Sequence, residues 1–278
     1  MISVAMASYN GEKYIYDQIM SILNQTVQID ELIICDDNST DNTVKEVKRI
    51  DDHRIKLYVN SQNLGYINNF HKAVGLTKGD LVFLADQDDI WINTKVEKMT
   101  KIMKDKSCEA LCSNFVLIDA NGEEIHYKEQ FNTNSFIDDA KKYLERITFR
   151  RLVFGNIAQG CTYCISGKVR DTYAEISNSQ VVHDYQIMLI AASIGDVYFV
   201  NENLIKYRLH GNNSIGFTKK ERKFIFEKKK PKKRPMMVEF IDDMSAVTKV
   251  RWKQFYKVLY YLRIPYIRAI ISRLFLGK

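Results

Sequence analysis

Prolines, glycines and long apolar runs are scarce in this chain of 278 residues, and each scarcity excludes a class of protein. With 3 Pro and 12 Gly, the sequence excludes a collagen-like repeat and disfavours long linkers without structure. No window contains the roughly 18 consecutive apolar residues that a membrane-spanning helix needs. The first ten residues have no basic region and turn polar at Ser8, so we expect no signal peptide.

The cysteines are five in number and cannot all be paired, which favours a reducing, cytoplasmic location over a disulfide framework. Two pairs, Cys108 with Cys112 and Cys161 with Cys164, could offer four thiolates to zinc. Both pairs lie in apolar stretches, and free cysteines are commonly buried as small hydrophobic residues. We therefore expect them in the core, with zinc as the alternative.

The formal net charge of +7 is divided unevenly along the chain. Residues 219–278 hold 18 Lys and Arg against 5 Asp and Glu, a net of +13, which leaves −6 for residues 1–218. This contrast indicates two units, an acidic domain over 1–218 and a basic tail over 219–278.

Short apolar runs alternate with amphipathic segments in the first hundred residues. The expected strands are 2–9, 31–37, 55–59 and 81–85, and the expected helices are 12–24, 43–50, 66–77 and 93–106. This alternation predicts an α/β fold with a mostly parallel sheet covered by helices on both faces. Residues 109–218 alternate less regularly, with strands expected at 110–118, 161–165 and 196–200 and helices at 137–150 and 184–194.

Polar clusters follow three of the expected strands. They are Ser8-Tyr9-Asn10, Asp36-Asp37 and Asp86-Gln87-Asp88-Asp89. Ligands of open parallel sheets bind beyond the carboxyl ends of the strands, so we expect the three clusters to meet at one edge and form a site.

The third cluster places two carboxylates a few ångströms apart, which is unfavourable unless a cation lies between them. Oxygen ligands suit Mg²⁺ or Mn²⁺, which complete their coordination with water and phosphate oxygens. A solvated acidic turn that caps the next helix is the alternative, and the position opposite two other polar clusters favours the metal site.

Several motifs, in order along residues 1–217, carry a resemblance to a known family. They are Val4-Ala-Met-Ala-Ser-Tyr-Asn-Gly, Ser21-Ile-Leu-Asn-Gln-Thr, Glu31-Leu-Ile-Ile-Cys-Asp-Asp, Phe83-Leu-Ala-Asp-Gln-Asp-Asp-Ile-Trp and Tyr207-Arg-Leu-His-Gly-Asn-Asn-Ser. Together they resemble family 2 glycosyltransferases of the GT-A fold, and the fourth is similar to that of rhamnosyltransferase-like members. The resemblance implies inverting transfer from a nucleotide-diphospho-sugar, a dTDP- or UDP-sugar, to an acceptor hydroxyl.

The resemblance also implies roles on the donor side. Tyr9 would pack against the nucleotide base of the donor, and Asp37 would hydrogen-bond that base. Asp88 would be a direct metal ligand, Asp86 would lie nearer the ribose, and His210 would reach the metal or diphosphate from the far wall. The implied donor set is Ala7, Tyr9, Glu12, Asp37, Asn68, Lys72, Asp86 and Gln87, with Asn68 or Lys72 in place of an arginine that many relatives carry.

The general base must lie opposite the leaving diphosphate, where it can take the proton of the acceptor. Asp184 opens an expected helix, whose N-terminus favours an ionised carboxylate, and it matches the base of the family that this chain resembles. The alternatives are that Asp184 only caps the helix and that His183 is a core histidine. The acceptor side is expected at Gly160, Cys161, Thr162 and His183.

The basic tail begins with ten Lys and Arg between residues 219 and 234. Apolar and aromatic residues then recur at helical spacing from Trp252 to Leu274, with cationic residues between them, and Pro265 kinks or splits this segment. A cationic stretch followed by an aromatic amphipathic helix suits an anionic membrane surface. The alternative is a helix that packs back on the body.

The leading hypothesis is a glycosyltransferase that extends a lipid-linked or cell-surface glycan while bound peripherally to the cytoplasmic face of the membrane. A nucleotidyltransferase is an alternative, although it would need a glycine-rich basic loop after the first strand. A nucleic-acid-binding protein is another, but it leaves the acidic clusters at the strand ends unexplained. We therefore expect no nucleic-acid partner.

Overall fold

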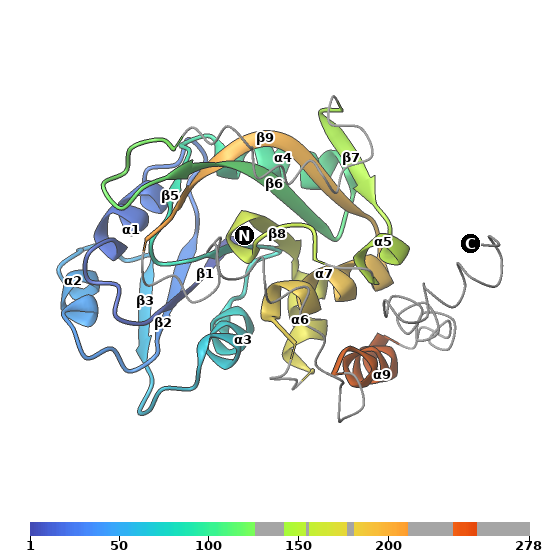
Figure 1. The fold of residues 1–278 in the computed structure, drawn as a ribbon, viewed down its shortest axis with the longest axis horizontal. Coiled ribbons are helices and arrows are strands. Elements are labelled where there is room, and N and C mark those ends of the chain that lie inside the picture. Colours follow the sequence, from blue (N-terminus) through green and yellow to red (C-terminus); the bar gives the residue numbers. More distant parts are fainter. Residues whose placement is uncertain (126–141, 154–155, 177–180, 211–235, 249–278) are drawn as a thin grey trace, which may run out of the picture.

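The computed structural model describes residues 1–125, 142–153, 156–176, 181–210 and 236–248. In this part of the chain a nine-stranded mixed sheet runs in the order β3-β2-β1-β4-β8-β6-β9-β5, with β7 paired to β9 (Figure 1). The predicted α/β class is confirmed.

The first half alternates strands and helices as the sequence predicts. Its elements are β1 (Ile2–Ser8), α1 (Ile15–Leu23), β2 (Glu31–Asp36), α2 (Thr43–Lys48), β3 (Ile55–Val59), α3 (Tyr66–Leu76) and β4 (Leu81–Ala85). All pairings among these four strands are parallel. The carboxyl ends of the strands therefore share one edge of the sheet.

The second half is mixed in direction. Its elements are β5 (Ile90–Trp91), α4 (Lys95–Lys106), β6 (Ala110–Ile118), β7 (Leu144–Ile147), α5 (Phe149–Val153), the 3₁₀ helix η2 (Gly160–Thr162), β8 (Tyr163–Ser166), α6 (Gly167–Ala174), α7 (His183–Ile194), β9 (Val197–Arg208) and α9 (Met236–Thr248). β8 lies antiparallel between β4 and β6, whereas β6 and β9 are parallel.

The prediction of a helix over 137–150 is wrong at residues 144–147, because these residues form the strand β7. This strand pairs antiparallel with β9 and buries Ile147 at its end. Pairing with a distant strand outweighs local helical preference here, and helix α5 begins only at Phe149.

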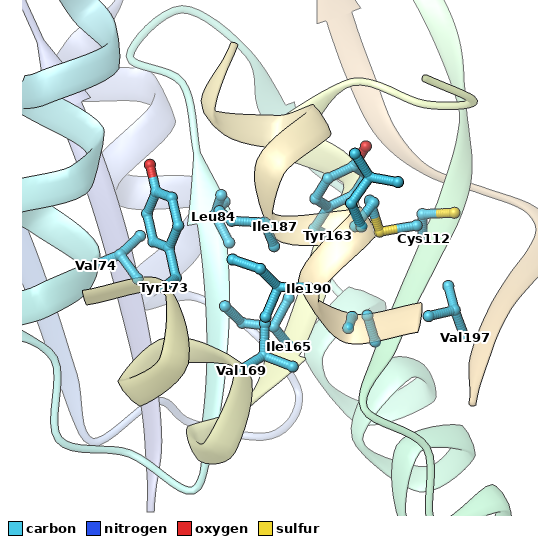
Figure 2. Close-up of a cluster of buried hydrophobic side chains, with 14 of the residues drawn as sticks. Val74, Leu84, Cys112, Tyr163, Ile165, Val169, Tyr173, Ile187, Ile190 and Val197 are labelled. Carbon is cyan, nitrogen blue, oxygen red and sulfur yellow. The ribbon is translucent and has the colours of Figure 1, made fainter. Parts of the chain in front are cut away.

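The core has two layers because side chains alternate across the strands. In β4, Val82 and Leu84 point into one apolar cluster, while Phe83 points into the other. The first cluster lies under α3, α6, α7 and α9, and the second under α1, α2 and α4. Figure 2 shows Ile187 and Ile190 of α7 among the residues of the first cluster.

Helix α7 is buried almost all round, which is typical of an internal helix. Six consecutive residues, Gln186 to Ala191, are buried. Tyr185 at its start donates a hydrogen bond from its hydroxyl to the carbonyl of Leu152 in α5 at 2.6 Å. The N-terminus of α7 is therefore held in place by the packing of the whole helix.

Helix α9 falls within the range 219–278 that the sequence assigns to the tail. Phe240, Ile241 and Met244 are buried in the first cluster, and α9 packs against α7. The cationic run 219–234 and the aromatic segment 252–274 lie outside the described residues. Among the described helices, none has both the length and the apolar character needed to cross a bilayer.

All five cysteines are unpaired and buried, as expected for core residues. Four of them pack in apolar surroundings. Cys161 differs, because its thiol lies with the carboxylates of Asp86 and Asp89, within 4.8 Å between ligand atoms.

Candidate active site

The three polar clusters meet at one edge of the sheet, as predicted. The hydroxyl of Ser8 donates to Asp36 at 2.8 Å, which joins the ends of β1 and β2. Gln87 joins β1 to β4, since its Oε1 accepts from the backbone N–H of Tyr9 at 2.8 Å and its Nε2 donates to the Tyr9 carbonyl at 3.0 Å.

Gly11 leaves room for the Gln87 side chain. A Cβ at this position would lie 2.2 Å from Gln87 Oε1, closer than any real contact. Gln87, expected to bind the donor, thus also fixes the loop after β1, and the glycine of the first motif is required by that close approach.

Asp37 is buried and holds the loop over 60–65. Its Oδ1 accepts from Asn60 Nδ2 and the Leu64 N–H, both at 2.8 Å, and its Oδ2 accepts from the Gly65 N–H at 2.9 Å. Lys72 donates to Asn60 Oδ1 at 2.6 Å, so it reaches Asp37 through one intermediate side chain.

The remaining donor-side residues lie near the same edge. Tyr9 is 45% exposed, Ala7 is half-buried, and Glu12 is exposed and accepts from the N–H and Nδ2 of Asn42 at 2.8 and 2.9 Å. Asn68 is exposed and bonds the Leu64 carbonyl at 2.9 Å. Neither Asn68 nor Lys72 contacts the acidic cluster in the interactions described.

The motif Ser21-Ile-Leu-Asn-Gln-Thr supports the acidic loop from below. Gln18, one turn earlier, donates to the Asp86 carbonyl at 2.9 Å, and Ser21 Oγ accepts from the Trp91 N–H at 3.0 Å. Gln25 donates to the Ile92 carbonyl and accepts from the Val96 N–H, both at 3.0 Å. Side chains of α1 and of the residues just after it thus hydrogen-bond the backbone between β4 and α4.

Asp86, Asp88 and Asp89 are crowded at the end of β4. Desolvation, together with the carboxylates of Asp88 and Asp184, raises the pKa of Asp86 to about 7. Desolvation and the other two carboxylates raise the pKa of Asp89 well above its usual range. Asp88 lies 2.7 Å from His210 Nε2, with their side chains 15% and 12% exposed. His210, expected to reach the metal or the diphosphate, thus lies against the acidic loop.

The sequence interpretation missed Lys95, which is fully buried beneath this cluster. Its Nζ donates to the Cys161 carbonyl at 2.7 Å and lies 3.8 Å from the centre of the Trp91 ring. Desolvation lowers the pKa of Lys95 to about 7, opposed by Asp89 and Asp86. No local signal marked Lys95, because Trp91 lies in β5 and Lys95 begins α4, so the fold and not a helical spacing brings the two together.

Arg208 was missed as well. It is 3% exposed, its Nε donates to the Asp88 carbonyl at 2.7 Å, and its backbone N–H donates to Asp89 at 3.0 Å. Its guanidinium lies 4.6 Å from the centre of the Tyr14 ring, which also contacts His210 at 5.1 Å. The end of β9 is thereby attached to the acidic loop and to the start of α1.

Asp184 stands at the first turn of α7, as expected. Its Oδ1 accepts from the Tyr185 N–H at 2.6 Å, and Asn156 and the Gly160 backbone also hydrogen-bond the carboxylate. Desolvation raises the pKa of Asp184 to about 6 against these hydrogen bonds. The carboxylate of Asp184 is among the groups that raise the pKa of Asp86, so the two carboxylates interact electrostatically.

The expected acceptor side is brought together at η2 and α7. A Cβ on Gly160 would lie 3.0 Å from His183 Nε2 and 3.2 Å from the Asp184 Cβ, so these groups are close. Cys161 faces the acidic cluster instead, and Thr162 is buried and bonds the Gln159 carbonyl at 2.7 Å.

The acidic side chains fit a divalent cation. Asp86, Asp89 and Cys161 can bring ligand atoms within 4.8 Å of one another, and Asp89 Oδ2 is buried without a hydrogen-bond partner. Asp88 and His210 provide a second, partly exposed pair of ligand atoms beside them. Carboxylate oxygens of this density suit Mg²⁺ or Mn²⁺.

The parallel first half of the sheet, the helices that cover it and the acidic loop after β4 define an α/β fold of the GT-A type. Residues 3–169 match glycosyl transferase family 2, and the chain belongs to that family and is a glycosyltransferase. The *Escherichia coli* protein WfgD, a UDP-Glc:alpha-D-GlcNAc-diphosphoundecaprenol beta-1,3-glucosyltransferase, is 30% identical over 215 residues, which are 75% of this chain and 77% of that one.

A second relative, the putative teichuronic acid biosynthesis glycosyltransferase TuaG of *Bacillus subtilis*, is 29% identical over 79% of this chain and 82% of its own. The fold is similar to that of *S. aureus* TarS residues 1–349 in complex with UDP-GlcNAc, with a TM-score of 0.67 at 15% identity over 99% of this chain and 75% of that one.

The raised pKa of Asp184 predicts a stability change that needs no substrate. Because its pKa rises from 3.8 to about 6 on folding, the ionised carboxylate destabilises the folded state above pH 6, and this cost disappears near pH 4. Asp184→Asn should therefore be more stable than the wild type by about 1–3 kcal/mol at pH 7.5, with the gain shrinking towards pH 4. Urea unfolding at both pH values measures it. Asp171→Asn, whose side chain is 66% exposed, is the control, and equal gains at both pH values would contradict the prediction.

Proposed function

We propose that this chain transfers a sugar, with inversion, from a UDP- or dTDP-sugar to a hydroxyl of a lipid-linked or cell-surface glycan. The functions of WfgD and TuaG support a glycan acceptor of this kind, and the complex of TarS supports a UDP-sugar donor. Within this chain, the anchored carboxylate of Asp184, which interacts electrostatically with Asp86 of the acidic loop, carries the proposal.

Asp184 is the general base. Three hydrogen-bond donors hold its carboxylate at the start of an internal helix, and its pKa of about 6 leaves it mostly ionised near neutral pH while still basic enough to accept a proton. As the acceptor oxygen bonds to the anomeric carbon, the bond from that carbon to the diphosphate breaks. The hydroxyl proton moves to Asp184.

Asp86, Asp88 and His210 would hold Mn²⁺ or Mg²⁺ on the donor side. When bound, such an ion would offset the negative charge of the departing diphosphate. Asp88 and His210, 2.7 Å apart, and Asp86, which lies in the cluster with Asp89 and Cys161, would supply the ligand atoms. The exposed ring of Tyr9 offers a surface for the nucleotide base, near the hydrogen-bonded carboxylate of Asp37.

The chain works at the cytoplasmic face of the membrane in this proposal, held peripherally through residues 219–278. Their net charge of +13 is the support, because clustered Lys and Arg bind anionic lipids. The domain over 1–218 then performs the transfer near an acceptor that is itself carried by lipid.

Replacing the base should abolish turnover and spare donor binding. Asp184→Asn keeps the size of the side chain but cannot take a proton, so we expect transfer to fall at least 10³-fold. Thermal stabilisation by UDP-glucose or UDP-GlcNAc with Mn²⁺ should stay within about twofold in apparent affinity. In the wild type, the rate should rise with pH to a plateau above about pH 6. Turnover unchanged by the substitution would remove Asp184 as the base.

Removing a proposed metal ligand should weaken the metal-dependent part of donor binding. We expect Asp88→Ala to need about tenfold more Mn²⁺ for half-maximal donor stabilisation, because one carboxylate ligand is lost. Asp105→Ala, on α4, is the control and should leave the Mn²⁺ dependence unchanged. An enzyme that is equally active in excess chelator would refute the metal role.

Membrane association is tested by flotation with liposomes. The full chain should float with vesicles that contain 30% phosphatidylserine at low salt and should dissociate as salt rises, since lysine clusters are screened. A variant in which the ten Lys and Arg of 219–234 are replaced by Gln should stay in solution. Equal flotation of both proteins would exclude this role for the cationic run.

A further inference from the structure

Three aromatic rings, those of Tyr66, Phe70 and His183, pack together beside Asp184. His183 stacks on Phe70 with ring centres 4.0 Å apart at 12°, and Tyr66 meets His183 edge-on at 6.2 Å and 74°. Tyr66 and Phe70 lie on α3, and His183 opens α7 next to Asp184. We call Tyr66, Phe70 and His183 the aromatic wall.

The wall has a buried part and an open part. Phe70 and His183 are 3% and 7% exposed, whereas Tyr66 is 38% exposed. Desolvation and the nearby Asp184 carboxylate raise the pKa of Tyr66, which places its hydroxyl in the electrostatic range of the base. The open ring of Tyr66 is therefore available to a molecule that also reaches Asp184.

His183 has an unusual hydrogen-bonding state. Its Nδ1 is buried without a hydrogen-bond partner, and desolvation lowers the pKa of the imidazole to about 3, so the ring is neutral at physiological pH. A neutral imidazole carries one N–H. A buried donor without an acceptor is rarer than a buried acceptor without a donor. The proton is therefore best placed on Nε2.

The Nε2 edge of His183 faces Gly160. A Cβ at Gly160 would lie 3.0 Å from Nε2 and 3.2 Å from the Asp184 Cβ. Glycine thus lets the backbone of η2 approach both groups, and no side chain at position 160 separates the imidazole edge from Asp184.

We propose that the aromatic wall binds the acceptor as an uncharged pyranose ring, which packs on Tyr66 and accepts a hydrogen bond from His183 Nε2. This rests on the proposed function, since it takes Asp184 as the base. The C–H face of a pyranose is apolar and packs well on an aromatic ring, while its hydroxyls need directed polar partners.

The preference for an uncharged ring follows from the surroundings. The three residues of the wall are neutral, and the carboxylate of Asp184 acts electrostatically on both Tyr66 and Asp86. A uronic acid placed here would add a third negative charge to those of Asp184 and Asp86. A hydroxyl-rich neutral sugar avoids this repulsion.

Saturation-transfer NMR detects the binding of a weak sugar ligand, because saturation of the enzyme's protons passes to a bound sugar, and the Tyr66 and His183 variants then test whether it binds at the wall. The probes are methyl β-D-glucopyranoside, methyl N-acetyl-β-D-glucosaminide and methyl β-D-glucuronide, each with the full chain, UDP and Mg²⁺. We expect transfer to at least one of the two neutral sugars and at least fivefold less to the glucuronide. Tyr66→Ala should reduce the neutral-sugar signal at least fivefold.

His183→Phe keeps the stack on Phe70 and removes the N–H, so we expect several-fold weaker binding of the neutral sugar. The matched control is His71→Phe on α3, whose imidazole contacts Tyr173 rather than the wall and which should bind like the wild type. Thermal unfolding verifies that each variant is folded.

Three outcomes would overturn the inference: no transfer to either neutral sugar in the wild type, equal transfer in Tyr66→Ala, or glucuronide bound as well as the neutral sugars. The proposed function fails separately, if the wild type neither binds nor turns over a nucleotide-sugar.

Discussion

The crowding of three carboxylates in a desolvated place at the end of β4 is the constraint on which the surrounding structure depends. Desolvation, together with the neighbouring carboxylates, raises the pKa of both Asp86 and Asp89. The groups that can offset this negative charge come from other helices and strands. Lys95 lies beneath the cluster on α4, and His210 contacts Asp88 from beyond the end of β9. The fold thus brings distant segments together around a charge that the first half of the chain cannot balance alone.

The closing motif after β9 has a structural function as well as a chemical one. Arg208 bonds the acidic loop through both its side chain and its backbone, and it also reaches the carbonyls of Asp119 and Ala120 after β6. Tyr14 contacts Arg208 and His210. Register shifts between β6 and β9 bend this pair of strands, as bulges do, on the way to the site. The start of α1, the end of β4 and the end of β9 therefore form one unit.

Much of the first half could be predicted because its signals are local. The apolar run Leu81–Ala85 and the carboxylates that follow it predict both a buried strand and a site at its end, and the parallel registers agree. β7 could not be predicted in this way, since Leu144–Ile147 is a strand only by virtue of pairing with β9. The burial of Lys95 was equally hidden, because a lysine in a helical first turn normally faces solvent and only the three-dimensional position of Cys161 and Trp91 gives it partners.

Within the site, the motifs were a better guide to which residues lie together than to the contacts that each residue makes. Asp37 was expected to bond a base, and the structure gives both of its carboxylate oxygens partners in the loop over 60–65. Gln87 likewise bonds the backbone of Tyr9. Residues of a binding motif can therefore fix the loops that surround a ligand, and the sequence does not separate that role from direct contact.

The position of Asp184 depends on the core more than on the loops around it. Helix α7 is enclosed along its length, with Ile187, Met188 and Ile190 fully buried, so its first turn cannot shift without moving the packing of the first apolar cluster. The carboxylate is further held by donors from Tyr185, Asn156 and Gly160. If the proposed general base, Asp184, stood on a surface loop, its distance from the acidic loop would vary more than it does on this packed helix. The same packing keeps His183 buried and neutral beside it, so the chemistry of this wall is determined by the apolar core beneath it.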